Sequence, residues 1–249
     1  MNGIGFCGCS YTEGVPYIQE EQMYSNLVRN YFKPLHFFNY AKGGSGNREI
    51  FLQALELISD TQVEHIFVQW SHSGRQRWKP AFDRLVTTTS RSYQNPVSDV
   101  LSISQNRFVT FIDVFRMIDN SYNQLVELGK QLHVLNNISN KLNKNIYYIN
   151  GGMHIDPLFL NNKAIHDFNK ELLPKSLDIL NLDVLPDSDI NAGITEIRNS
   201  LSEIDIKQWV DINQIKHVDK GNDGEHPGPE SNTILANKII NFLEEKIND

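Results

Sequence analysis

The chain has 249 residues, 40% of them hydrophobic, which suits one large globular domain with its own core. It carries 30 acidic and 23 basic side chains, a net charge of −7. This balance excludes general nucleic-acid binding, because that needs clustered Lys and Arg to neutralise phosphates.

Apolar runs alternate with helical patterns along the chain. We predict strands at residues 3–7, 35–40, 65–69, 145–150 and 208–212, and helices at about 23–32, 48–59, 122–142, 162–178 and 231–246. Such alternation implies an α/β fold, a three-layer α/β/α sandwich around a mostly parallel five-stranded sheet. We expect one domain of residues 1–249, with an irregular insertion at about 72–118. Because that insertion follows the carboxyl end of the third strand, we expect it to shape the substrate site.

The first strand ends in Gly8-Cys9-Ser10, which places a serine on a turn after a buried strand. A serine hydroxyl is a weak nucleophile and needs an imidazole to accept its proton and a carboxylate to orient that imidazole. Asp223 and His226, three residues apart before the last helix, supply both groups from one segment. The alternative is an ordinary polar turn with a surface histidine.

A glycine-rich segment follows the second strand and precedes a helix. It reads Asn39-Tyr40-Ala41-Lys42-Gly43-Gly44-Ser45-Gly46-Asn47. Glycines let backbone amides approach a ligand closely, and amides at a helix start favour developing negative charge. This pattern is typical of an oxyanion hole.

These three segments, in this order, resemble the SGNH (GDSL-type) hydrolase family. The matching residues are Gly8-Cys9-Ser10 in the first block, Asn39 and Gly44 in the second, and Asp223 and His226 in the last. The resemblance implies a flavodoxin-like SGNH hydrolase fold, with Ser10 as nucleophile, His226 as base and Asp223 as its partner. It also implies that the amides of Ser10 and Gly44 donate to the oxyanion.

The chain departs from this family at two places. Cys9 replaces the usual Asp beside the nucleophile, which leaves the chemistry possible. In the third block the family has Gly-x-Asn, whereas this chain has Gln69-Trp70-Ser71-His72, so the oxyanion asparagine is missing. Asn47 carries the same amide donor and is our candidate to replace it, although it could equally be a helix cap; Ser71 or His72 could also donate.

The insertion contains a basic and aromatic stretch. With Ser71 and His72, it gives the candidate substrate-binding residues Arg75, Arg77 and Trp78. Cations beside aromatic rings suit sugars or acidic glycans, and a solvated face is the alternative. The predicted partner is a small-molecule or glycan ester, with no nucleic acid and no membrane span; the sequence leaves the oligomeric state unknown.

No cofactor and no metal site are predicted. Cys7 and Cys9 lack a companion cysteine cluster and suit buried small side chains better than a disulfide or a metal site. The glycine-rich segment lacks the lysine of a phosphate-binding loop. With no signal peptide and no run of 18 apolar residues, we expect a cytoplasmic protein.

The leading hypothesis is a serine esterase that removes an O-acyl or O-acetyl group from a carbohydrate or similar small ester through an acyl-enzyme on Ser10. The altered third block motivates the alternative, a catalytically weak or inactive SGNH-like glycan-binding or structural protein. Phosphoryl chemistry at Ser10 is disfavoured, because the sequence contains no phosphate cradle.

Overall fold

The computed structural model describes most of the chain's two ends and part of its middle. The described residues are 3–14, 18–71, 76–78, 86–88, 121–151, 206–211 and 217–248. The chain divides into two compact units, one of Met1–Thr88, Val134–His154 and Asp205–Asp249, and one of Thr89–His133 and Ile155–Ile204. The helix predicted at 162–178 and most of the insertion at 72–118 lie outside the described residues. The single domain with an insertion therefore stays a prediction.

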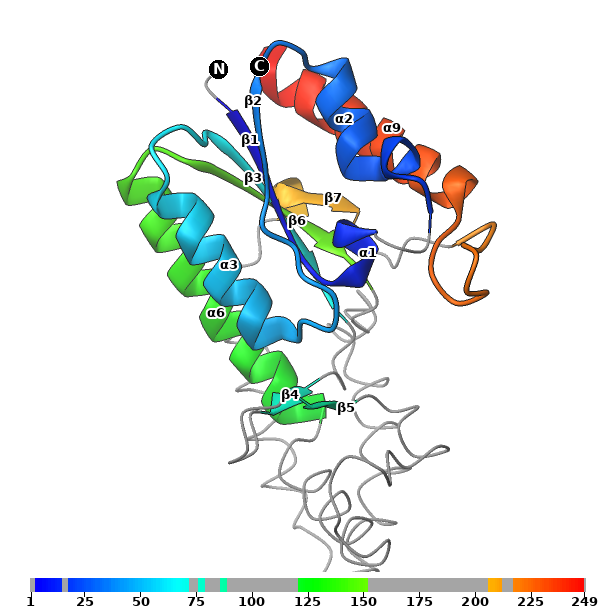
Figure 1. Cartoon of the computed structure of the whole chain (residues 1–249). Helices are drawn as coiled ribbons and strands as arrows, with labels where there is room; N and C mark the ends of the chain where they lie inside the picture. The colour runs from blue at the N-terminus through cyan, green and yellow to red at the C-terminus, as the bar shows by residue number, and fades with distance from the viewer. Residues whose placement is uncertain are drawn as a thin grey trace, which may run out of the picture. The chain divides into compact units, whose positions relative to one another are not determined.

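A five-stranded sheet forms the centre of the first unit (Figure 1). Its strands are β1 (Gly3–Cys7), β2 (His36–Asn39), β3 (His65–Trp70), β6 (Asn145–Asn150) and β7 (Trp209–Asp211). They lie in the order β2-β1-β3-β6-β7, and all four neighbouring pairs are parallel. Numbered within the sheet, this order is 2-1-3-4-5, which is that of flavodoxin-like folds. The predicted α/β class and parallel sheet are confirmed.

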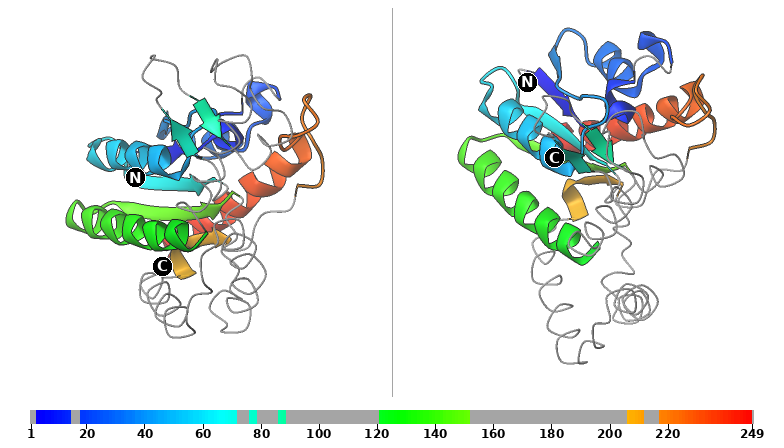
Figure 2. Two further views of the ribbon diagram at one scale, coloured as in Figure 1. Left: turned by 90° about the horizontal axis from the view of Figure 1, so that it is seen from below. Right: turned by 60° about the horizontal axis from the view of Figure 1, so that its bottom comes forward.

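Helices cover both faces of this sheet (Figures 1 and 2). On one face lie α2 (Tyr24–Tyr31) and α9 (Pro229–Asn248), which pack against each other; on the other lie α3 (Asn47–Ser59) and the C-terminal part of α6 (Ser121–Lys141). Two of the strands, β1 and β3, are buried along their whole length, as a sheet with two covered faces requires. The predicted three-layer arrangement is therefore confirmed.

Aromatic side chains fill the core between the sheet and the α2/α9 layer. The ring of Phe6 stacks on Phe67, with centroids 5.1 Å apart, and meets Tyr24 edge-on at 5.8 Å. Apolar residues of α9, including Leu235 and Ile239, belong to the same cluster. Because they recur every three to four residues, they form one apolar stripe along α9 that faces the core.

Short elements complete the described part. They are α1 (Ser10–Glu13), the 3-10 turns η1 (Glu20–Gln22) and η4 (Ile206–Gln208), and an antiparallel pair formed by β4 (Gln76–Trp78) and β5 (Val86–Thr88). Of the helices described, none is both long enough and apolar enough to cross a membrane.

Candidate active site

Ser10 is the first residue of α1, directly after the turn that ends β1. Gly8 makes this turn possible, because a Cβ atom there would lie 2.1 Å from the Thr12 side-chain oxygen. The short helix ends at Gly14, whose φ of +74° is the left-handed conformation that glycine adopts without strain. Ser10 is only 4% exposed, so its hydroxyl is held in a largely dry environment.

The structure brings together Ser10, His226 and Asp223. The distance from Ser10 Oγ to His226 Nε2 is 2.9 Å, and that from His226 Nδ1 to Asp223 Oδ2 is 2.5 Å. The first distance falls within the usual range of hydrogen bonds and the second is shorter than that range, although Ser10 and His226 are 216 positions apart in the chain. This is the geometry of a nucleophile, its base and the group that orients the base.

The charge of Asp223 fixes which nitrogen of the His226 imidazole carries the proton. Partial burial opposes the ionisation of Asp223. Hydrogen bonds from the backbone amide and side chain of His226 and from the amide of Glu225 outweigh this effect and lower the pKa of Asp223 to about 2. The ionised carboxylate can only accept, so Nδ1 of neutral His226 carries the proton. Nε2 is then free to accept the proton of Ser10 Oγ.

The loop that carries His226 is anchored to the start of α9. Both carboxylate oxygens of Asp219 accept amide hydrogens from the first turn of this helix, from Glu230 and Ser231, each at 2.8 Å. Negative charge at a helix N-terminus is favourable. Burial by itself raises the pKa of Asp219, but these bonds and one from the Ser231 hydroxyl outweigh it and lower the pKa below its ordinary value. The same loop closes on itself through a bond from Gly221 N–H to the His226 carbonyl.

Asn232 links this loop to α2. Its side-chain nitrogen donates to the carbonyls of Pro227 and Gly228 at 3.2 and 2.9 Å, and its oxygen accepts the backbone N–H of Tyr24 at 3.1 Å. Asn232 is 4% exposed, so water competes little for these bonds. The residue directly after His226 is thereby tied to the helix layer that covers the sheet.

The glycine-rich segment lies beside the nucleophile. Ser45 N–H donates to the Lys42 carbonyl at 3.1 Å and closes a turn in which Gly44 has a φ of +77°, as the third position of a type II turn requires. The Glu13 carboxylate of α1 accepts the amide of Gly43 at 2.5 Å. A Cβ atom on Gly43 would lie 3.9 Å from Ser10 Cβ, so this turn borders the serine.

Gln53 of α3 connects the glycine turn with the nucleophile turn. Its side-chain oxygen accepts the amide hydrogen of Gly8 at 3.0 Å, and its nitrogen donates to Ser45 Oγ at 3.0 Å. One side chain therefore sets the spacing between the two segments whose amides were predicted to form the oxyanion hole. The sequence analysis did not identify this residue.

Asn47 is the first residue of α3, and the N-cap position of that helix is occupied by Gly46. Its side-chain oxygen accepts the backbone N–H of Ser71 at 2.8 Å, which joins the helix start to the end of β3. Ser71 itself is 2% exposed. The amide nitrogen of Asn47 is the group that the predicted oxyanion role needs, and this role stays a prediction.

For the remaining predicted substrate-binding residues, the structure describes either the backbone alone or nothing. Arg77 and Trp78 lie in β4, paired with Thr87 and Val86 of β5, and their side chains lie outside the described part. His72 and Arg75 lie outside the described residues altogether. Their roles stay predictions.

A buried network of hydrogen-bonded polar side chains supports α1. The Tyr24 hydroxyl donates to Thr12 Oγ1 at 3.0 Å, and Thr12 Oγ1 donates to the Gln69 side-chain oxygen at 2.5 Å. The three side chains are at most 4% exposed. Gln69 therefore supports the helix that carries Ser10. No local pattern in the sequence around Gln69 predicts this contact.

A small cavity lies next to this network. Its lining consists of neutral residues only: Tyr11, Tyr24, Gln69, Asn150, Gly151, His217, Pro227, Ser231, Asn232 and Leu235. Tyr11 follows Ser10 in sequence and Pro227 follows His226. The lining contains hydroxyl, amide and imidazole groups but no carboxylate and no lysine or arginine, which suits a neutral polar occupant such as water.

Within the described ranges, no group of three or more His, Cys, Asp or Glu side chains is arranged to hold a metal ion. Cys7 and Cys9 are buried, free thiols. Burial raises the pKa of the Cys7 thiol far above its ordinary value, which makes it unreactive.

The sequence matches no protein-family model and no curated protein. Among solved structures, the chain is similar to the psychrotrophic esterase EstA from Pseudoalteromonas sp., with a TM-score of 0.47 and 10% identity over 100% of both chains. It is also similar to a member of the lipolytic protein G-D-S-L family from Veillonella parvula DSM 2008, with a TM-score of 0.41 and 12% identity over 96% of both chains. These matches are structural similarities along nearly the whole chain and assign no activity.

Proposed function

We propose that this protein is an SGNH-type serine ester hydrolase. The single observation that carries the proposal is the chain of hydrogen bonds from Ser10 through His226 to Asp223, with distances of 2.9 and 2.5 Å. A structural serine or a surface histidine has no need of such an arrangement. The three groups are presented by two segments that are each braced by further hydrogen bonds, which favours a preorganised site.

In the proposed reaction, Ser10 Oγ attacks the carbonyl carbon of an ester while its proton moves to His226 Nε2. The carbonyl electron pair shifts to its oxygen, and the proposed donors to this oxyanion are the amides of Ser10 and Gly44 and the side chain of Asn47. When the tetrahedral intermediate collapses, the alcohol leaves with the proton from His226. Water then attacks the acyl-enzyme, with His226 again as base, and releases the acid and free Ser10.

The proposed substrate is a small ester, such as an O-acyl or O-acetyl group on a carbohydrate. The sequence of β4 supports this class, because it contains Arg77 and Trp78, and cations beside aromatic rings suit sugars.

The test is hydrolysis of p-nitrophenyl acetate by the wild type, by Ser10→Ala and by Ser59→Ala. Ser59 is an exposed serine at the end of α3 and serves as the matched control. We expect only Ser10→Ala to lose turnover, and a fluorophosphonate to label Ser10 in the other two proteins. Absence of both turnover and label in the wild type would refute the proposal and favour a binding protein.

A further inference from the structure

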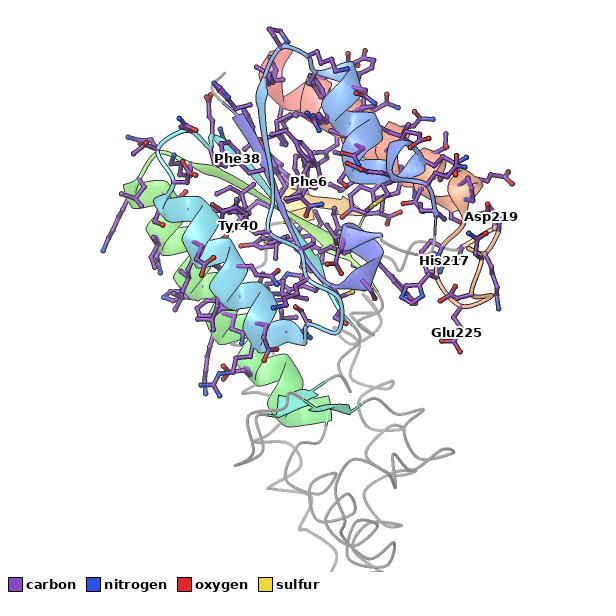
Figure 3. The ribbon with its side chains drawn as sticks, in the orientation of Figure 1. Phe6, Phe38, Tyr40, His217, Asp219 and Glu225 are labelled. Carbon is purple, nitrogen blue, oxygen red and sulfur yellow. The ribbon has the colours of Figure 1, made fainter. Side chains whose placement is uncertain are left out.

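The aromatic ring of Tyr11 contacts two imidazoles. Its centroid is 5.2 Å from that of His226 with an interplanar angle of 79°, and 5.3 Å from that of His217 with an angle of 71°. Both contacts are T-shaped, an arrangement that aromatic pairs prefer. Figure 3 shows His217 and Glu225 on the segment that leads into α9, across from α1.

The proposed base needs support from outside its own loop. Asp223, Gly224 and Glu225, the three residues before His226, are all exposed. During the proposed reaction Ser10 Oγ loses its proton and becomes acylated, so its hydrogen bond to Nε2 is lost. The imidazole must nevertheless keep its place for the second half-reaction. In that interval the bond to Asp223 and the packing of Tyr11 hold the ring.

His217 is the second imidazole in contact with Tyr11. Partial burial lowers the pKa of His217, the Asp219 carboxylate opposes this lowering, and the neighbouring His226 strengthens it. His217 is therefore uncharged at neutral pH and places no second positive charge beside the base. It can pack against Tyr11 as a neutral aromatic ring.

We infer that Tyr11 is a positioning residue, which packs against His217 and His226 and keeps the imidazole of His226 aligned with Ser10 and Asp223. The inference rests on the proposed function and adds a role for the residue next to the nucleophile. Because the contact involves the ring, phenylalanine replaces tyrosine and an aliphatic side chain does not. His217 positions His226 indirectly, by holding the ring of Tyr11.

The kinetic test compares Tyr11→Phe and Tyr11→Leu with the wild type, using p-nitrophenyl acetate. An aromatic contact of this kind corresponds to a factor of roughly 2 to 12 in rate. We expect Tyr11→Leu to lower kcat by this factor with KM unchanged, and Tyr11→Phe to keep the wild-type kcat. Tyr31→Leu, on α2 at an exposed position, is the matched control. Equal kcat in Tyr11→Leu and the wild type, or equal losses in both Tyr11 variants, would overturn the inference.

A second measurement separates this inference from the proposed function. The proton between His226 Nδ1 and Asp223 gives a downfield NMR signal whether or not the protein cleaves esters. We expect the signal to persist in Tyr11→Phe and Tyr31→Leu and to broaden or disappear in Tyr11→Leu at an unchanged overall fold. An unaltered signal in Tyr11→Leu would show that the ring does not position His226, even if the wild type is an active esterase.

Discussion

Replacing Gln53 by leucine should damage both stability and turnover. The substitution removes the acceptor of the buried Gly8 amide and the donor to Ser45 Oγ, each at 3.0 Å. Leaving a buried N–H without a partner costs about 1–3 kcal/mol. A loss near 2 kcal/mol lowers the melting temperature of a chain of this size by about 4–8 °C.

Turnover should fall for a separate reason. The amide of Gly8 precedes the nucleophile by two residues, and Ser45 follows the predicted oxyanion donor Gly44. Once Gln53 no longer spaces these segments, a displacement on the order of 1 Å lowers kcat by about 100-fold with little effect on KM. The assays are thermal unfolding by circular dichroism and hydrolysis of p-nitrophenyl acetate.

Two further variants make this prediction specific. Gln62→Leu is the same substitution at an exposed position and should change neither quantity. Gln53→Glu keeps an acceptor for Gly8, and the Ser45 hydroxyl can donate to the new carboxylate, so most activity should remain. If Gln53→Leu melts and turns over like Gln62→Leu, the reasoning about the two turns is wrong.

Three more predictions follow from the same region. Gly8→Ala places a Cβ atom 2.1 Å from the Thr12 side-chain oxygen, so we expect about 1–3 kcal/mol of destabilisation in urea unfolding; an unchanged midpoint would contradict this close approach. Asp219→Ala removes the acceptor for two amides at the start of α9, so stability should fall by about 0.5–2 kcal/mol and these amides should exchange faster with deuterium; unchanged exchange would contradict the capping role. The pKa of Asp223 is lowered to about 2, so its contribution to stability is present above its unfolded pKa near 4 and is lost as the pH falls towards 2. The urea midpoint of Asp223→Asn should therefore lack this pH dependence between pH 4 and 2. A pH dependence equal to that of the wild type would refute the stabilising role of Asp223.

The sequence predicted the sheet well because each strand is a short apolar run between turn residues. Residues 3–7 and 145–150 were predicted with the bounds that the structure has for β1 and β6. The start of the last helix was less accurate, since α9 begins at Pro229 and not near 231. Proline suits the first position of a helix because it has no N–H to leave unpaired.

The proximity of Ser10, Asp223 and His226 could be predicted because Gly8-Cys9-Ser10 and the Asp223–His226 pair resemble the first and last blocks of the SGNH family. The supporting residues could not, since a hydrogen bond between distant segments leaves no local pattern. The sequence does carry one signal of these supporting residues. Gln53 and Asn232 are polar residues at positions that their helices otherwise fill with apolar side chains, such as Ile50 and Ala54 around Gln53. A polar group in such a stripe needs a partner in the core.

The separation of Ser10 and His226 along the chain also bears on how the protein is made. During synthesis from the N-terminus, the turn that carries Ser10 leaves the ribosome before the segment that carries His226 and before α9. The nascent chain therefore contains Ser10 before the imidazole that it contacts in the folded protein has been made. The proposed nucleophile gains its proposed proton acceptor only when α9 packs on the sheet and completes the core.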